Sequence, residues 1–229
     1  MSTEIPVPNL PVRDEDKALI KSINAFVHAY MAQPAHDNSH DYFHILRVVS
    51  NAKTLLGEEM KENPDQKYDT SALFLAALLH DVGDHKYAKP GEDTENQIYR
   101  IMREHGAHDL MAFKVQAIAK HISWTNEMRD PQSVADTLAE FPELAIVQDA
   151  DRLDAIGAVG IARCFAYGGA RRMDLPMSAC FDIYDAKLYK LPGTMKTRTG
   201  REVAISRKNT LETFRRQFEE ESRLSFGYN

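Results

Sequence analysis

An apolar run from Ala72 to Leu79 ends directly in the pair His80–Asp81, and this feature most limits how the chain can fold. The Ala and Leu content of the run favours a helix over a strand. A charged pair at the tip of such a segment is costly, because burying a carboxylate costs several kcal/mol unless a cation compensates for it. A divalent metal ion is the usual compensation, and His with Asp is a common ligand mixture. The run therefore predicts a helix that ends at a metal site.

Two further residues complete a set of candidate metal ligands. His44 lies upstream beside the apolar face of an expected helix, and Asp151 lies downstream in an expected mid-helix position. Together with His80 and Asp81 they would supply two imidazoles and two carboxylates and leave coordination positions open for water and a phosphate oxygen. This mixture suits Mn, Fe, Co, Ni or Mg better than a closed structural zinc site. The alternative is that scattered surface and capping residues fall in this order by chance.

The order His, then His–Asp, then Asp resembles the HD-domain superfamily of metal-dependent phosphohydrolases. The likeness spans roughly residues 37–167 and continues more weakly over 187–220. The strings at 40–44 and 149–157 look most like a bacterial and fungal subgroup whose characterised members are manganese-dependent nucleoside triphosphate pyrophosphohydrolases. The resemblance implies a single-domain, all-α HD-domain fold with the metal site between core helices. It also implies one divalent ion, Mn before Mg, Co, Ni, Fe or Zn.

Apolar periodicity along the chain also predicts helices almost throughout. We expect a loose N-terminal arm at 1–13, an HD metal-binding helical core at 14–170, and a C-terminal extension at 171–229. The extension, with a basic loop and a final helix, is expected to pack on the same domain. Helices are expected at 14–31, 94–106, 109–123 and 206–225, and one long helix is expected from Pro142 to Gly168–Gly169. Two further helices are expected between the first two of these. One is capped by Asn38 or Ser39 and broken from Gly57, and the other is capped by Thr70 or Ser71. A short hairpin around 194–204 is the one candidate for strand structure.

Asp84 is the predicted catalytic acid/base. It follows Asp81 by one turn, where the resemblance implies a Glu or Asp in many HD hydrolases. A carboxylate there could move the proton of an attacking water. The alternative is a turn residue after Gly83.

Five residues are predicted to bind substrate. His40 lies one turn before His44, and could instead cap the helix or pair with Asp37. His121 could serve a second metal or a substrate phosphate, or could be a satisfied core histidine. Lys187 and Lys196 are favoured among a run of cations at 187–207 that could clamp a triphosphate, although a solvated basic loop explains any one of them equally well. Asp154 is expected one turn beyond Asp151, near the substrate.

Helix geometry separates Asp149 from Asp151. Residues two apart on a helix lie on roughly opposite faces, so only one can point at the metal cluster. Asp151 matches the ligand position of the superfamily. Asp149 is therefore expected to face away, toward solvent or a partner side chain.

The predicted function is metal-dependent hydrolysis of a nucleotide, with pyrophosphate released from a nucleoside triphosphate. A 5′-nucleotidase or a guanosine alarmone hydrolase of the same fold is the near alternative. A di-iron oxygenase or a non-catalytic nucleotide-binding module are alternatives of other classes. The net charge of −6 argues against bulk nucleic-acid binding, and no apolar stretch is long enough to span a membrane. Two unpatterned cysteines, Cys164 and Cys180, fit the reducing cytoplasm, with nuclear entry and oligomeric state left open.

Overall fold

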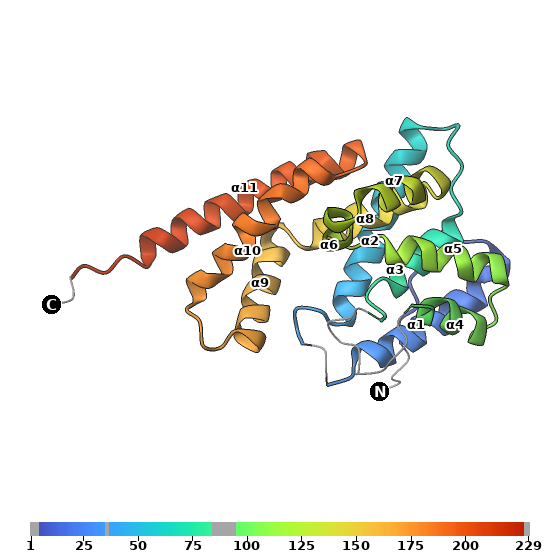
Figure 1. The fold of residues 1–229 in the computed structure, drawn as a ribbon, viewed down its shortest axis with the longest axis horizontal. Helices are drawn as coiled ribbons and strands as arrows, with labels where there is room; N and C mark the ends of the chain where they lie inside the picture. The colour runs from blue at the N-terminus through green and yellow to red at the C-terminus, as the bar shows by residue number, and fades with distance from the viewer. Residues whose placement is uncertain (1–4, 35–36, 84–94, 227–229) are drawn as a thin grey trace.

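The computed structural model describes residues 5–34, 37–83 and 95–226, and all regular structure in these segments is helical (Figure 1), which confirms the all-α class. The α-helices are α1 (Lys17–Met31), α2 (Tyr42–Glu62), α3 (Thr70–Leu79), α4 (Gln97–Glu104), α5 (Asp109–Lys120), α6 (Trp124–Arg129), α7 (Pro131–Glu140), α8 (Glu143–Asp154), α9 (Gly157–Arg171), α10 (Phe181–Ala186) and α11 (Arg198–Glu221). Short 3₁₀ turns are η1 (Asp14–Asp16), η2 (Met177–Cys180) and η3 (Leu188–Thr194).

Helix α3 is the centre of the core. Every residue from Ser71 to Leu79 is buried, because α1, α2, α5 and α8 pack around it. The Asp69 side chain caps its first turn by accepting the N–H of Ala72, in place of the expected Thr70 or Ser71. Because α3 is surrounded by other helices, the residue at its C-terminal end, His80, lies in the interior.

Helix α2 packs along α8, and the two helices hold His44 and Asp151 respectively. The side chain of Asp41 caps α2 by accepting the N–H of His44 at 2.9 Å, so the expected caps Asn38 and Ser39 are wrong. The expected break at Gly57 is also wrong, since α2 continues to Glu62. Gly57 is exposed, and the cost of about 1 kcal/mol for a helical glycine is outweighed by the buried apolar face of α2.

The expected long helix after Pro142 is two helices. Helix α8 ends at Asp154, and Gly157 adopts a φ of 79°, which turns the chain into α9. Only glycine takes this left-handed conformation without a steric penalty. Asp151 therefore lies in the last turn of α8 rather than in mid-helix. The turn also lets α9 run back toward the site, where Arg163 contacts Asp154.

The C-terminal helix α11 begins at Arg198, so the hairpin expected around 194–204 is wrong. Thr197 caps α11 with its side chain, and the cationic sequence that follows is helical. Helix α11 packs on α8, α9 and η3 and then extends away from them, at the left of Figure 1. Aromatic contacts join α9, α10 and α11, with ring centroids 5.6 Å apart for Phe165 and Phe214 and 5.1 Å apart for Phe181 and Phe218.

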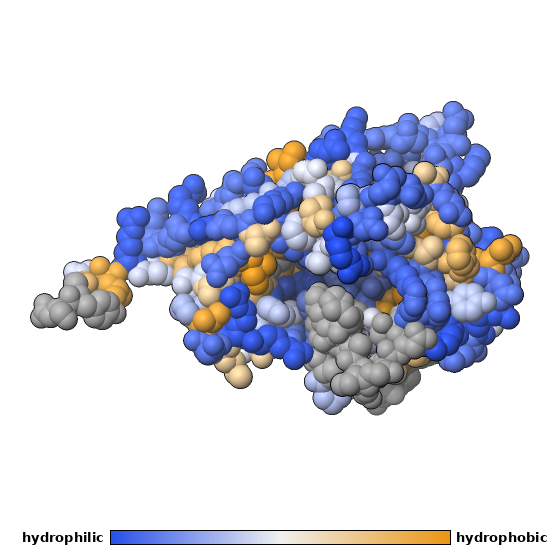
Figure 2. All heavy atoms as spheres, in the orientation of Figure 1, coloured by the Kyte–Doolittle hydropathy of each residue, from blue (hydrophilic) through white to orange (hydrophobic). Residues whose placement is uncertain are grey.

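The described part of the N-terminal arm has no regular structure before η1, but it is held against the core. The carbonyl of Pro6 accepts a hydrogen bond from Asn24, and that of Asn9 accepts one from Lys53. The face of the molecule in Figure 2 is mostly hydrophilic, with small separate hydrophobic patches. None of the described helices is both long and apolar enough to cross a membrane.

Candidate metal centre

Three helices bring the four predicted metal ligands to one point. His44 lies in the first turn of α2, His80 caps the C-terminus of α3 with Asp81 next to it, and Asp151 lies in the last turn of α8. The Nε2 atom of His44 is 3.1 Å from Nε2 of His80, 3.3 Å from Oδ2 of Asp81 and 3.7 Å from Oδ1 of Asp151. The Nε2 atom of His80 is also 3.7 Å from Oδ1 of Asp151.

The hydrogen bonds of the two imidazoles determine which nitrogen of each ring carries the proton. His44 Nδ1 lies 2.7 Å from the Asp154 carboxylate, and His80 Nδ1 lies 2.8 Å from the carbonyl oxygen of Ala77. Both partners are acceptors, so in the neutral rings both Nδ1 atoms are the donors and both Nε2 atoms carry lone pairs. Two lone pairs that face each other at 3.1 Å, beside two carboxylates, are stabilised by a positive charge between them, either a metal ion or a proton.

The donor set therefore fits a divalent ion. His44, His80 and Asp81 each offer one ligand atom, and these atoms all lie within 4.8 Å of one another. Oδ2 of Asp81 is buried and has no hydrogen-bond partner among the described residues. The 3.3 Å approach to His44 is no hydrogen bond in the tautomer above, because the proton of that ring lies on Nδ1. A buried carboxylate oxygen of this kind is expected at a metal site.

The pKa shifts show the same demand for positive charge. Burial by itself raises the pKa of the Asp81 carboxyl, but the neighbouring His80 and His44 outweigh it and hold the pKa well below its usual range. Burial and the charge of Arg163 disfavour protonation of His44, yet the carboxylates of Asp154 and Asp81 outweigh them and raise its pKa. An ion bound to Nε2 would meet this demand in place of a proton.

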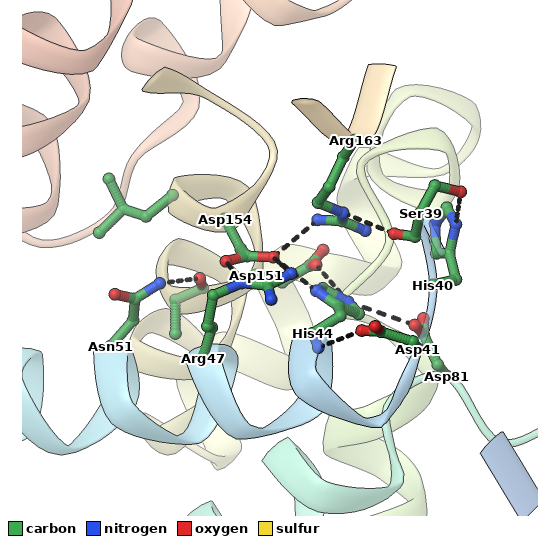
Figure 3. Close-up of polar contacts among 12 residues, drawn as sticks. Ser39, His40, Asp41, His44, Arg47, Asn51, Asp81, Asp151, Asp154 and Arg163 are labelled. Atoms are coloured by element: carbon green, nitrogen blue, oxygen red, sulfur yellow. Dashed lines mark hydrogen bonds and ion pairs between the residues drawn. The ribbon is translucent and has the colours of Figure 1, made fainter. Parts of the chain in front are cut away.

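Asp154 lies behind His44 and orients it (Figure 3). Its carboxylate accepts His44 Nδ1–H at 2.7 Å, Arg47 Nε–H at 2.8 Å and Arg163 Nη1–H at 3.0 Å. Arg163 also donates to the carbonyl oxygen of Ser39, which ties α9 to the start of α2. Burial alone raises the pKa of Asp154, but these partners lower it overall. The side chain is only 3% exposed, so it supports the site from within.

A cavity of about 530 Å³ opens from the ligand cluster. Three of the predicted substrate residues line it, namely His40, His121 and Lys187, whereas Asp154 and Lys196 do not. Lys187 Nζ lies 5.9 Å from the ring centroid of Trp124, which lines the same cavity. The predicted acid/base Asp84 lies outside the described residues.

His40 and His121 differ in how they are held. The His40 ring centroid is 5.8 Å from that of His44, and its Nδ1 contacts Ser39 Oγ at 2.8 Å. His121 caps the C-terminus of α5, and both of its nitrogens are engaged. Its Nδ1 donates to the carbonyl of Ala117 at 2.7 Å, and its Nε2 contacts Ser133 Oγ at 2.8 Å. His121 would have to leave Ser133 before that nitrogen could bind a ligand.

Lys196 is paired with a residue that the sequence did not single out. Its Nζ donates to Glu127 at 2.6 Å and to the carbonyl of Thr194 at 3.0 Å. Glu127 also pairs with the buried Arg152, whose Nη1 donates to the same carbonyl at 2.8 Å. Glu127 lies on α6, a short helix with too few residues to show a period, so no sequence signal indicated it.

Asp149 faces away from the ligand cluster, as predicted, and of the two predicted alternatives it faces a partner rather than solvent. Its buried carboxylate accepts the N–H groups of Lys196 and Thr197, at 2.9 and 2.7 Å, and the Thr197 hydroxyl. Burial raises the pKa of Asp149 even against these hydrogen bonds. Asp149 thereby holds the start of α11 against α8, and the two carboxylates of the same turn serve different parts of the protein.

Comparison with known proteins agrees with this arrangement. The HD domain family model matches residues 41–156. Bacillus subtilis YpgQ is 33% identical over 189 residues, which are 80% of this chain and 85% of that protein. A crystal structure of YpgQ in complex with ADP is similar with a TM-score of 0.62 and 30% identity, and the match covers 87% of this chain and 92% of that one. A crystal structure of an HD-superfamily hydrolase from Bacillus thuringiensis has a TM-score of 0.62 and 29% identity, over 91% of this chain and 98% of that one. The His–His–Asp cluster and these similarities together show that the chain belongs to the HD domain family.

Proposed function

We propose that the protein is a metal-dependent phosphohydrolase that converts nucleoside triphosphates to monophosphates and pyrophosphate. The observation that carries the proposal is the convergence of two imidazole Nε2 atoms and two carboxylates at one end of a cavity. Cations line the cavity beyond this cluster, among them Lys187. A site that joins a ligand set for a hard or borderline ion to basic side chains suits a substrate with several phosphates.

His44, His80, Asp81 and Asp151 would hold one divalent ion, with manganese favoured by the subgroup resemblance. When bound, such an ion lowers the pKa of water and neutralises charge on the phosphate that is attacked. Asp154 keeps the Nδ1 proton of His44 in place, so that Nε2 stays available as a ligand.

The remaining roles are proposed for the predicted acid/base and for residues that line the cavity. Asp84 is proposed to take a proton from the attacking water, whose oxygen bonds to the α-phosphorus while the bond to the bridging oxygen breaks and pyrophosphate leaves. His40, His121 and Lys187 line the cavity and are proposed to contact the nucleotide. We assign Asp154 and Lys196 to support of the site, through His44 and Glu127 respectively.

Nucleotide chemistry has independent support from the relative of known structure. YpgQ was crystallised with ADP, and the match covers most of both chains. A nucleotide substrate is also in keeping with a cytoplasmic location, for which the two free cysteines, Cys164 and Cys180, argue.

Two observations distinguish the competing functions: whether additional metal ligands are available, and which reaction products form. A di-iron oxygenase needs more donors, but His105 bonds Ser22 at 2.6 Å and both nitrogens of His121 are engaged. A 5′-nucleotidase or an alarmone hydrolase would use the same cluster, and a non-catalytic module would bind nucleotide without turnover.

The test is product analysis with the full chain and added divalent metals. Nucleoside tri-, di- and monophosphates and a guanosine alarmone are incubated with the Mn-loaded protein, and ion chromatography identifies the products. Monophosphate plus pyrophosphate is the expected result, abolished in His80→Ala. Inorganic phosphate formed only from monophosphates would replace the proposal with a nucleotidase, and nucleotide binding without products would replace it with a binding module.

A further inference from the structure

Two cationic residues of the cavity form no ion pair within the part of the chain that the structure describes. Lys120 ends α5 and Arg129 ends α6, and both residues line the cavity. Neither forms an ion pair with any acidic residue in the described segments. The other two arginines of the cavity differ, because Arg152 pairs with Glu127 and Arg163 pairs with Asp154. Among the described residues, no ion pair therefore neutralises the charges of Lys120 and Arg129.

The side chain of Asn126 forms hydrogen bonds with both cationic residues. Asn126 donates from Nδ2 to the carbonyl oxygen of Lys120 at 2.9 Å, and its Oδ1 accepts from Arg129 Nη2 at 3.2 Å. The ends of α5 and α6 are thus held together at the cavity wall. Two carboxylates that line the cavity outside the metal cluster are already engaged: Asp130 caps α7 through Ser133 N–H at 3.1 Å, and Glu95 makes an interaction of its own.

We propose that Lys120 and Arg129 bind the distal phosphates of a polyphosphate tail, the part of the substrate that becomes pyrophosphate. This inference rests on the proposed function and names the residues that select a triphosphate over a monophosphate. A monophosphate carries a single phosphate to the metal cluster, whereas a polyphosphate tail carries further charged groups along the cavity, which these cations also line. The sequence favoured Lys196 for this task, but its ammonium group is neutralised by Glu127.

The test is calorimetric titration of inorganic tripolyphosphate, and separately of orthophosphate, into the Mn-loaded full chain. Lys120→Gln and Arg129→Gln are each expected to weaken tripolyphosphate binding by about tenfold, the effect of losing one charge-assisted hydrogen bond. Orthophosphate and Mn binding should stay unchanged. The matched control is Lys190→Gln, an exposed lysine of η3 outside the cavity, which should bind as the wild type does. Arg129→Lys keeps the charge and should restore most of the affinity.

Kinetics supply a second readout. Lys120→Gln and Arg129→Gln should raise KM for a nucleoside triphosphate by a similar factor and leave kcat nearly unchanged, with the effect reduced at high salt. Variants that bind tripolyphosphate as Lys190→Gln does would overturn the inference. A wild type that releases no pyrophosphate would overturn the proposed function, and the binding titration, which needs no turnover, would still decide the role of the two cations.

Discussion

His44 and Asp154 are joined by a 2.7 Å hydrogen bond between Nδ1 and Oδ2, at the junction of α2 and α8. The bond keeps the proton of His44 on the side away from the cavity and aims Nε2 at His80. Because Arg47 and Arg163 bind the same carboxylate, residues of α2, α8 and α9 together fix the orientation of one candidate metal ligand.

Asp154→Asn should weaken Mn binding by about 10- to 100-fold, the range typical for a partner of a metal-bound histidine. The amide can still accept from His44, but it leaves the charges of Arg47 and Arg163 unpaired. Calorimetric Mn titration measures the effect. Asp185→Asn, an exposed carboxylate paired with Arg215, is the control and should leave Mn affinity unchanged. An Asp154→Asn protein with wild-type affinity would contradict the orienting role.

Asp151→Ala and Asp149→Ala should have opposite effects. Asp151→Ala should abolish Mn binding and spare the fold, since its side chain is 26% exposed and borders the cavity. Asp149→Ala should keep the ion but lower the free energy of unfolding, by about 1–3 kcal/mol for each N–H of Lys196 and Thr197 left unsatisfied. Mn titration and urea unfolding of both variants check this. Loss of Mn from the Asp149 variant alone would show that Asp149, and not Asp151, lies on the face of α8 that binds the ion.

Asp84→Asn should keep the metal and lose turnover by about 10²- to 10⁴-fold, the usual contribution of a general acid or base. His80→Ala should lose both metal and turnover, because a ligand is removed. Mn titration together with the rate of pyrophosphate release distinguishes the two variants. Full turnover by Asp84→Asn would remove Asp84 from the mechanism.

Glu127 should make the stability of the metal-free protein depend on acidity. Burial raises its pKa, but Lys196 and Arg152 outweigh that effect and lower the pKa below the ordinary 4.5. The unfolded chain then binds the proton at a higher pH than the folded one, so the stabilisation is full above 4.5 and is lost as pH falls through the folded pKa. Urea unfolding across this acidic range should be less pH-dependent for Glu127→Gln than for the wild type. Glu219→Gln, an exposed partner of Arg215, should follow the wild type, and equal slopes for all three proteins would refute the assignment.

The candidate metal ligands could be proposed from the sequence, where His80 and Asp81 have the strongest local signal. His80 and Asp81 end an apolar run, and a run that is buried on every side leaves its last residue in the interior. Helix rotation, which needs only the spacing of Asp149 and Asp151, predicted that the two residues face different ways, and the resemblance to the superfamily chose Asp151 as the one that faces the cluster. Helix type and most apolar faces were predictable for the same reason, since the period of the pattern lies within each segment.

The partners of these residues were decided only by the tertiary structure. Nothing local to Asp154 shows that α2 and α9 bring His44, Arg47 and Arg163 to it, and nothing near Lys196 shows that Glu127 neutralises it. The left-handed turn at Gly157, which divides the expected long helix, is set by how α9 must pack and not by the composition around it. A sequence pattern reports which side chains are buried, whereas packing between distant elements determines which charges meet. For this reason the candidate ligands could be predicted from the chain, whereas the residues that orient them, and the cavity cations that lack an ion pair in the described segments, could not.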